Sequence, residues 1–370
     1  MWLCAPLSRG AFLLRETGPM KFKSTPNTTT AAHSNIWERR IASHFARIAV
    51  IFLIVSGGAV PAQTRVTQAE SPANASATRT FTDEIGRRVN VPLKVNRIVS
   101  LAPNLTEIVF ALKEENYLAG DTDFCDYPPE AARKPRVGGP VNPNLEEIVK
   151  LRPDLILATS INRRETVDAL NRLGLPVYIT DPHSVDEMIA SVERIGNVLG
   201  IEKSAATLVE NLRARLAELD RRLAHAAPRR ALFVVWTTPL ISIGRGTFIA
   251  DALRHAGARS VVETDSEWPR INLEEIVRLQ PEFLVFASAH AGDTHQDIDA
   301  LRSRPGWRDL DAMRQEKIVI VSDAIIRPVP RIVDAIEQLA RSLHPEAFAS
   351  LAAPRANSKP TVEEACACAR

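Results

Sequence analysis

Residues 144–160 read NLEEIVKLRPDLILATS, and residues 272–288 read NLEEIVRLQPEFLVFAS. About half of the positions are identical, and most of the others exchange Lys with Arg, Asp with Glu, or one aliphatic residue with another. Only two copies occur, 128 residues apart, so an array of short stacked repeats is excluded. The duplication predicts two similar lobes.

Each copy predicts a helix, a tight turn and a buried strand. In the first copy, Asn144 is a good helix N-cap, and Glu147 has the spacing that completes a capping box. Pro153 ends the helix after about two turns. The apolar run Leu155–Ala158 then lacks alternation, as expected of a strand covered on both faces in a parallel sheet.

One carboxylate in each copy has no local task. Glu146 and Glu274 occupy the second helical position, not the capping-box position. A carboxylate in the first turn complements the helix dipole, which is worth about 0.3 to 1 kcal/mol. That account suffices for a single glutamate, but a matched pair with one member in each lobe favours a function.

Composition excludes several classes of function. The chain has 370 residues and a net charge of +2, with no basic stripe and no zinc-finger spacing, so we expect no nucleic-acid partner. No GxxxxGK[ST] phosphate loop is present. The four cysteines are scattered and do not form a disulfide framework.

The pattern along the chain predicts six segments. Basic residues followed by the apolar run 48–55 and by small residues near position 62 are typical of a signal peptide, and the run is too short to span a bilayer. We therefore expect an exported, periplasmic protein. The segments are a leader (1–62), a linker (63–78), an N-terminal α/β lobe (79–182), connecting helices (183–228), a C-terminal α/β lobe (229–348) and a disordered tail (349–370).

Two further local patterns give predictions about helix ends. Asn104 and Glu107 have capping-box spacing at the start of a helix, and Pro330 is placed to be a first-turn residue of the last long helix. Residues 202–226 contain no Gly or Pro and predict one helix of about 37 Å between the lobes. Alternating strands and helices in each lobe predict parallel sheets with right-handed crossovers.

The chain resembles a known family over about residues 80–346. The resemblance is to the iron-siderophore and vitamin B12 class of ABC-transporter substrate-binding proteins, and most of all to its cobalamin binders, through CDYPPEA (125–131) and the placement of Trp268. Its other motifs, besides the repeated stretch, are RIVSLAPNLTEIVFAL (97–112), TDFCDYPPEA (122–131), GTFIADALRHAG (246–257) and RPVPRIVDAIEQLARSLHPE (327–346).

This resemblance implies an architecture and a function. The fold would be two Rossmann-like α/β lobes joined by a long backbone helix, with the ligand held between the lobes. The chain would be a monomer without a cofactor that carries cobalamin or a related corrinoid to a membrane permease. The ligand residues implied are Tyr127, Trp236 and Trp268, with Phe124 and Asp126 in the same loop as Tyr127.

The matched glutamates acquire a role from the same resemblance. In the family, one glutamate on each lobe docks into a basic pocket of a permease subunit, and Glu146 and Glu274 match those positions. Such exposed charges fix orientation more than they add affinity.

The sequence also leaves alternatives open. Pro140 and Thr159 stand where the resemblance would place further aromatic residues, which admits cobinamide, haem or a ferric siderophore as ligand. Trp236 could instead be a core residue, and Tyr127 could stack on Pro128.

Two other classes of protein remain as rivals. A periplasmic enzyme is one, although no GxSxG elbow is present. A metal-ion receptor is the other. The residues that could serve a metal are Asp123, Asp126 and Asp181 in the first lobe with His183 just after it, and His290 and His295 in a loop of the second lobe.

Overall fold

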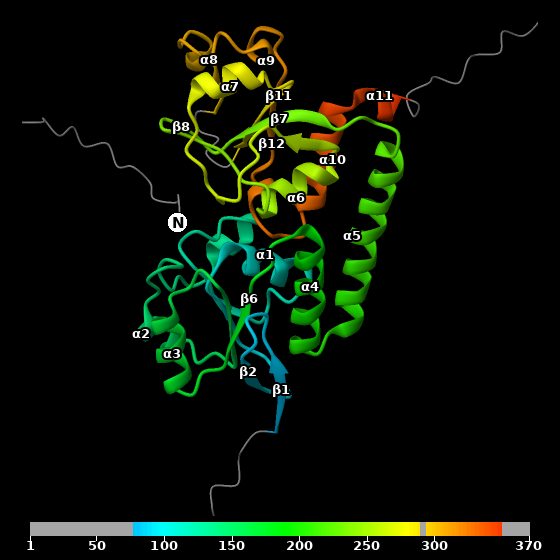
Figure 1. The fold of residues 1–370 in the computed structure, drawn as a ribbon. Helices are drawn as coiled ribbons and strands as arrows, with labels where there is room; N and C mark the ends of the chain where they lie inside the picture. The colour runs from blue at the N-terminus through cyan, green and yellow to red at the C-terminus, as the bar shows by residue number, and fades with distance from the viewer. Residues whose placement is uncertain (1–76, 289–293, 350–370) are drawn as a thin grey trace, which may run out of the picture. The chain divides into compact units, whose positions relative to one another are not determined.

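The computed structural model of the protein describes residues 77–288 and 294–349 (Figure 1). It contains two four-stranded parallel sheets, each flanked by helices, which confirms the predicted α/β fold class. The predicted leader lies outside the described residues, as do the linker before residue 77 and the tail after residue 349.

Lobe one is built on the sheet with strand order β4-β3-β5-β6. A hairpin that turns at Asp83–Gly86 precedes this sheet as the antiparallel pair β1 (Thr78–Thr82) and β2 (Arg88–Pro92). The sheet strands are β3 (Ile98–Ser100), β4 (Leu118–Gly120), β5 (Leu155–Thr159) and β6 (Val177–Thr180). The helices are α1 (Pro103–Ala111), the 3-10 helix η1 (Pro129–Arg133), α2 (Leu145–Lys150) and α3 (Arg164–Arg172).

Two helices follow lobe one and pack side by side (Figure 1). Ser184 caps α4 (Val185–Leu199), and Gly200 ends it in the left-handed conformation, with φ +76°. Helix α5 (Glu202–Leu223) has 22 residues, so it is about 33 Å long. Gly196 of α4 faces Ala205 of α5 so closely that a Cβ atom at position 196 would overlap the Ala205 methyl group.

Lobe two repeats the plan with strand order β10-β7-β11-β12. Its sheet strands are β7 (Arg229–Val234), β10 (Ala258–Ser260), β11 (Phe283–Ala287) and β12 (Ile318–Val321), and a short hairpin is formed by β8 (Trp236–Thr237) and β9 (Leu240–Ile241). The helices are α6 (Phe248–His255), α7 (Leu273–Leu279), α8 (Thr294–Arg302), α9 (Asp311–Arg314), the 3-10 helix η3 (Asp323–Ile326), α10 (Ile332–Leu343) and α11 (Pro345–Phe348).

One hydrophobic cluster extends through both lobes and the connecting helices. It includes Leu105 of α1, Val192 of α4, Leu212 of α5 and Ile336 of α10, all of them buried. Burial of aliphatic side chains is the main stabilising contribution, at about 25 cal/mol per Å² of apolar surface. The connecting helices are therefore part of the core.

The predicted helix caps are confirmed only in part. The Asn144 side chain accepts from the N–H groups of Glu146 (3.0 Å) and Glu147 (3.2 Å), as an N-cap should. The second half of the predicted capping box is wrong: the Asn144 N–H donates to the carbonyl of Val137 at 2.7 Å, and the Glu147 carboxylate pairs with Lys150 at 2.6 Å.

Two other predicted helix starts are also wrong. Helix α1 begins at Pro103 with Ala102 as N-cap and no side-chain cap, and Glu107 forms an ion pair with Arg331 of lobe two. Helix α10 begins at Ile332, so Pro330 precedes the helix and is not in its first turn.

Candidate functional site

Two exposed tryptophans lie on neighbouring segments of lobe two. Trp236 is the first residue of β8, just after β7, and is 36% exposed; its indole N–H donates to the carbonyl of Thr238 at 2.8 Å. Trp268, which is 42% exposed, lies in the segment before α7. Trp307, in contrast, is buried in the core. The structure therefore does not place Trp236 in the core.

Backbone hydrogen bonds join these two segments. The N–H groups of Ser242 and Gly244, which follow β9, donate to the carbonyls of Pro269 and Glu267, each at 3.1 Å. In the opposite direction, the N–H of Ile271 donates to the carbonyl of Leu240 in β9 at 3.0 Å. The β8–β9 hairpin and the Trp268 segment are thus one structural unit.

The predicted ligand residues of lobe one lie in the loop that follows β4. The Tyr127 side chain is 47% exposed, and the Tyr127–Pro128 peptide bond is cis. The guanidinium of Arg331 lies over the Tyr127 ring, with its Cζ 4.3 Å from the ring centroid. Asp126 is exposed and pairs with Arg327 at 3.4 Å. Phe124 is half-buried and does not join the polar contacts.

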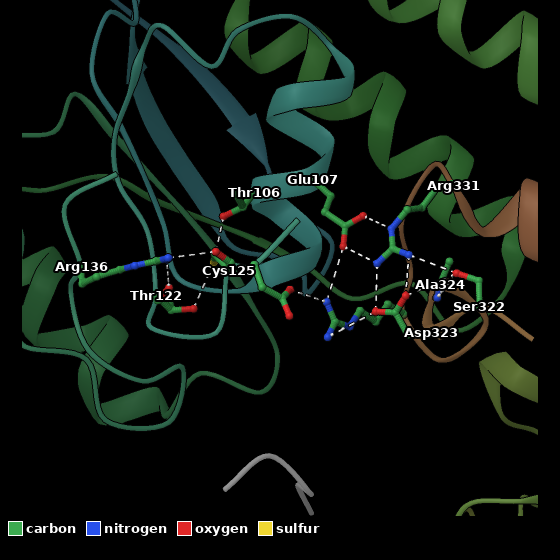
Figure 2. A network of polar contacts seen from close by, with 11 residues as sticks. Thr106, Glu107, Thr122, Cys125, Arg136, Ser322, Asp323, Ala324 and Arg331 are labelled. Atoms are coloured by element: carbon green, nitrogen blue, oxygen red, sulfur yellow. Dashed lines mark hydrogen bonds and ion pairs between the residues drawn. The ribbon is translucent and has the colours of Figure 1, made fainter. Parts of the chain in front are cut away.

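Arg136 fixes the backbone of this loop, as Figure 2 shows. Its Nη1 donates to the carboxylate of Asp121 at 2.7 Å and to the carbonyl of Thr122 at 2.5 Å, and its Nη2 donates to the carbonyl of Cys125 at 3.1 Å. Burial raises the pKa of Asp121 to about 7, although Arg136 acts in the opposite direction.

Cys125 is a packing residue of the same loop. Its thiol is fully buried between the hydroxyls of Thr106 (3.1 Å) and Thr122 (3.2 Å). Burial raises the pKa of the thiol to about 11, so it is neutral and unreactive at physiological pH.

A network of charged side chains joins this part of lobe one to lobe two (Figure 2). Buried Glu107 of α1 pairs with Arg331 at 2.5 Å, and Arg331 also pairs with Asp323 of η3 at 2.6 Å. Burial raises the pKa of Glu107, partly offset by Arg331 and Arg327. Burial also acts to raise the pKa of Asp323, but the hydrogen bond and charge of Arg331 outweigh it and the net shift is downward.

The two positions at which the resemblance would place further aromatic residues are both in the interior of the protein. Pro140 and Thr159 are both buried, and both are held by Asn162. The Asn162 amide group donates to the carbonyls of Pro140 (2.6 Å) and Leu101 (3.2 Å), and its carbonyl accepts from the Thr159 N–H at 2.8 Å. Sequence reasoning missed Asn162, whose only signal was a polar residue shortly after a buried strand.

The matched glutamates are exposed on both lobes. Glu146 and Glu274 each occupy the second residue of a helix, α2 and α7. Neither carboxylate forms an ion pair with another described residue, whereas the neighbouring Glu147 pairs with Lys150. Both are therefore available to an external partner.

The residues proposed for a metal do not converge where their side chains are described. His183 lies 3.3 Å from Asp181, and Asp126 pairs with Arg327 of lobe two. No group of three or more His, Cys, Asp or Glu side chains is arranged to hold a metal ion in the part of the chain that the structure describes. His290 lies outside that part, and the side chain of His295 is not described.

Within residues 77–288 and 294–349, no helix is both long enough and apolar enough to cross a bilayer.

Comparison with known proteins identifies relatives along most of the chain. An ABC transporter substrate-binding lipoprotein of Bacillus subtilis strain 168, YvrC, is 28% identical over 73% of this chain and 86% of its own. The solved vitamin B12-binding protein BtuF of Vibrio cholerae is 25% identical, with a TM-score of 0.59 over 69% of this chain and 98% of its own. The heme-binding protein RhuT of Roseiflexus sp. RS-1 is 26% identical, with a TM-score of 0.61 over 68% and 99%.

The family model described as periplasmic binding protein matches residues 98–324, which is more than half of the chain. This range contains both four-stranded sheets, the connecting helices and the exposed residues Tyr127, Trp236 and Trp268. The chain therefore belongs to the periplasmic binding protein family, within the class of ABC-transporter substrate-binding proteins for vitamin B12, siderophores and haem.

Proposed function

We propose that this protein binds cobalamin or a related corrinoid between its lobes and delivers it to an ABC-transporter permease. The observation that carries the proposal is the exposure of three large aromatic side chains, Tyr127, Trp236 and Trp268, on segments that follow strands of the two parallel sheets. Ligands of open α/β sheets bind at the carboxyl ends of the strands. Large aromatic side chains exposed there favour a binding function.

The chemistry of a corrinoid suits these residues. A corrinoid offers a broad apolar face bordered by amides, and a rigid aromatic ring buries much apolar area with little loss of rotamer freedom. The vitamin B12-binding protein of Vibrio cholerae supports this choice of ligand through its overall similarity.

Haem is the second candidate, and one residue favours it. The similarity to the Roseiflexus heme-binding protein is as extensive as that to the vitamin B12-binding protein. Tyr127 offers an exposed phenol, and a tyrosine oxygen is one of the protein ligands that haem iron accepts. Tyr127→Phe separates the two ligands, because it keeps the ring for a corrinoid but removes the oxygen for iron.

Delivery and export complete the proposal. The exposed carboxylates of Glu146 and Glu274, one per lobe, would orient the protein on the two permease subunits. Residues 1–62 would direct export to the periplasm, as the lipoprotein and periplasmic descriptions of the relatives suggest. N-terminal sequencing of the mature protein should find residue 1 removed, and its retention would contradict export by this route.

Calorimetric titration with cyanocobalamin tests the ligand site. Trp268→Ala and Trp236→Ala should each weaken binding at least about tenfold, as expected for central aromatic residues of an interface. The control is Tyr117→Ala, which removes a comparably exposed ring at the amino end of β4 and should leave affinity unchanged. Unchanged affinity in both tryptophan variants would contradict the proposed site.

A further inference from the structure

The guanidinium of Arg331 has an acceptor for every one of its N–H donors. Nε donates to Glu107 Oε2 at 2.5 Å, and Nη2 donates to Glu107 Oε1 at 3.0 Å and to Asp323 Oδ2 at 3.1 Å. Nη1 donates to Asp323 Oδ1 at 2.6 Å and to Ser322 Oγ at 3.3 Å. A guanidinium has five N–H donors, so all of its in-plane bonding capacity is used.

Only the two flat faces of this group remain for other contacts. The Cζ atom at its centre lies over the ring of Tyr127, 4.3 Å from the ring centroid. The Arg331 side chain is only 14% exposed, and a cation held over an aromatic ring is more strongly attracted when it is shielded from water. The two carboxylates fix the plane of the guanidinium, and the ring of Tyr127 lies against this fixed group.

We propose that Arg331 is a positioning residue for the ligand site: it holds the Tyr127 ring by its flat face, so that the ring is set before ligand arrives. Arg331 does not donate to the ligand, because none of its N–H groups remains unused. The positioned ring contributes a preformed contact surface, which lowers the ordering cost of binding.

The two carboxylates come from different lobes, so the positioning of the Tyr127 ring depends on contact between the lobes. Glu107 belongs to α1 of lobe one, whereas Asp323 belongs to η3 of lobe two. Arg327 adds a second link, since it pairs with Asp126, the residue before Tyr127. The ring of Tyr127 is therefore held in place only while lobe two contacts α1.

Lysine cannot replace Arg331 in this role. A lysine ammonium keeps the positive charge but has no plane and only three donors, so it can pair with a carboxylate without orienting a ring. The Arg331→Lys variant therefore keeps the positive charge but loses the positioning of the Tyr127 ring.

Fluorine NMR of the ligand-free protein labelled with 3-fluorotyrosine tests the positioning directly. The chain has three tyrosines: Tyr117 is exposed, Tyr178 is buried, and Tyr127 is the one under test. Arg331→Lys should shift the Tyr127 resonance alone. The control is Arg215→Lys, because Arg215 also pairs with two carboxylates, of Asp334 (2.5 Å) and Glu337 (3.0 Å), and should leave all three resonances in place.

An unchanged Tyr127 resonance in folded Arg331→Lys would overturn the proposal. If that variant does not fold, all three resonances collapse and Glu107→Gln decides, because it removes one acceptor of the guanidinium and keeps the side-chain shape. Glu107→Gln must then shift the Tyr127 resonance alone, and its failure to do so would also overturn the proposal.

The effect on affinity rests on the proposed function and needs a second readout. Arg331→Lys and Tyr127→Ala should each weaken cyanocobalamin binding by about tenfold, and the double variant should bind no more weakly than either single variant. Additive losses would show that Arg331 acts independently of the ring and would overturn the positioning role. If the unchanged protein binds no corrinoid, the proposed function fails, whereas the fluorine result still decides whether Arg331 positions the ring.

Discussion

The carboxyl group of Asp121 couples the loop of the candidate site to pH. One oxygen accepts from Arg136, and the other is buried without a hydrogen-bond partner among the described residues. Burial raises its pKa to about 7 from 3.8, so between these pH values the folded protein binds more protons than the unfolded chain. The contribution of Asp121 to the free energy of unfolding therefore falls as the pH rises from about 4 to about 7.

Replacement of Asp121 by asparagine should remove this dependence. Because one pH unit of difference between the two pKa values corresponds to about 1.4 kcal/mol, the wild-type stability minus that of Asp121→Asn should fall by a few kcal/mol across the window. Urea unfolding at pH 4, 5, 6 and 7 measures the difference. Parallel stability curves for the two proteins would contradict the raised pKa.

Single residues were predictable where their immediate neighbours decide their environment. Trp268 stands between Glu267 and Pro269 in a polar segment and is exposed, as these neighbours indicate. Glu107 was assigned to a capping box, but it pairs with Arg331, 224 residues away. Local spacing cannot reveal an ion pair between distant segments.

At the scale of elements, the contact between α4 and α5 depends on a residue without a side chain. An exposed helical Gly→Ala exchange gains up to about 1 kcal/mol. Gly196→Ala should instead lower the free energy of unfolding by about 1 to 3 kcal/mol, because the new methyl group meets the Cβ of Ala205. Chemical denaturation of the purified variant measures the change.

A paired exchange provides the control. Ala205→Gly combined with Gly196→Ala moves the methyl group to the opposite helix and should recover stability relative to Gly196→Ala alone. An increase in stability with Gly196→Ala would show that the helices can separate at this point at little cost.

Elements were predicted best where a strong start or stop signal coincides with a regular pattern. Gly174 precedes the apolar strand Val177–Thr180, and Gly200 ends the amphipathic helix α4, as both sequence patterns indicate. The start of α10 was misplaced by two residues: Arg331, which the prediction put inside the helix, serves as its N-cap and makes the ion pairs to Glu107 and Asp323. A tertiary contact decided that boundary, and the helix pattern alone could not show it.

At the scale of the whole chain, the duplicated unit gives the same scaffold twice but not the same surface. Trp268 precedes the second copy and is exposed, whereas Pro140 precedes the first copy and is buried against Asn162. The duplication could be seen in the sequence. The burial of Pro140 could not be seen there, because it depends on the hydrogen bond from Asn162 in another loop.

The matched carboxylates predict a loss of transport without a loss of binding. Glu146→Lys combined with Glu274→Lys replaces attraction by repulsion at both ends of the proposed docking surface and should lower uptake at least about tenfold. Uptake of labelled ligand by cells and calorimetry on the purified variant measure the two properties separately.

The control for this prediction uses the neighbouring glutamates. Glu147→Lys combined with Glu275→Lys makes the same change in charge one residue along each helix and should affect uptake much less. Equal uptake in wild type and in the Glu146→Lys, Glu274→Lys double variant would contradict the docking role.

Calorimetric titration of the purified, ligand-free protein with cyanocobalamin, cobinamide, haem and a ferric siderophore is the most direct test of the account. We predict saturable one-to-one binding of cyanocobalamin or cobinamide, tighter than that of haem or the siderophore. Tighter binding of haem or the siderophore would contradict the corrinoid assignment, and no binding of any of the four would contradict the ligand site itself.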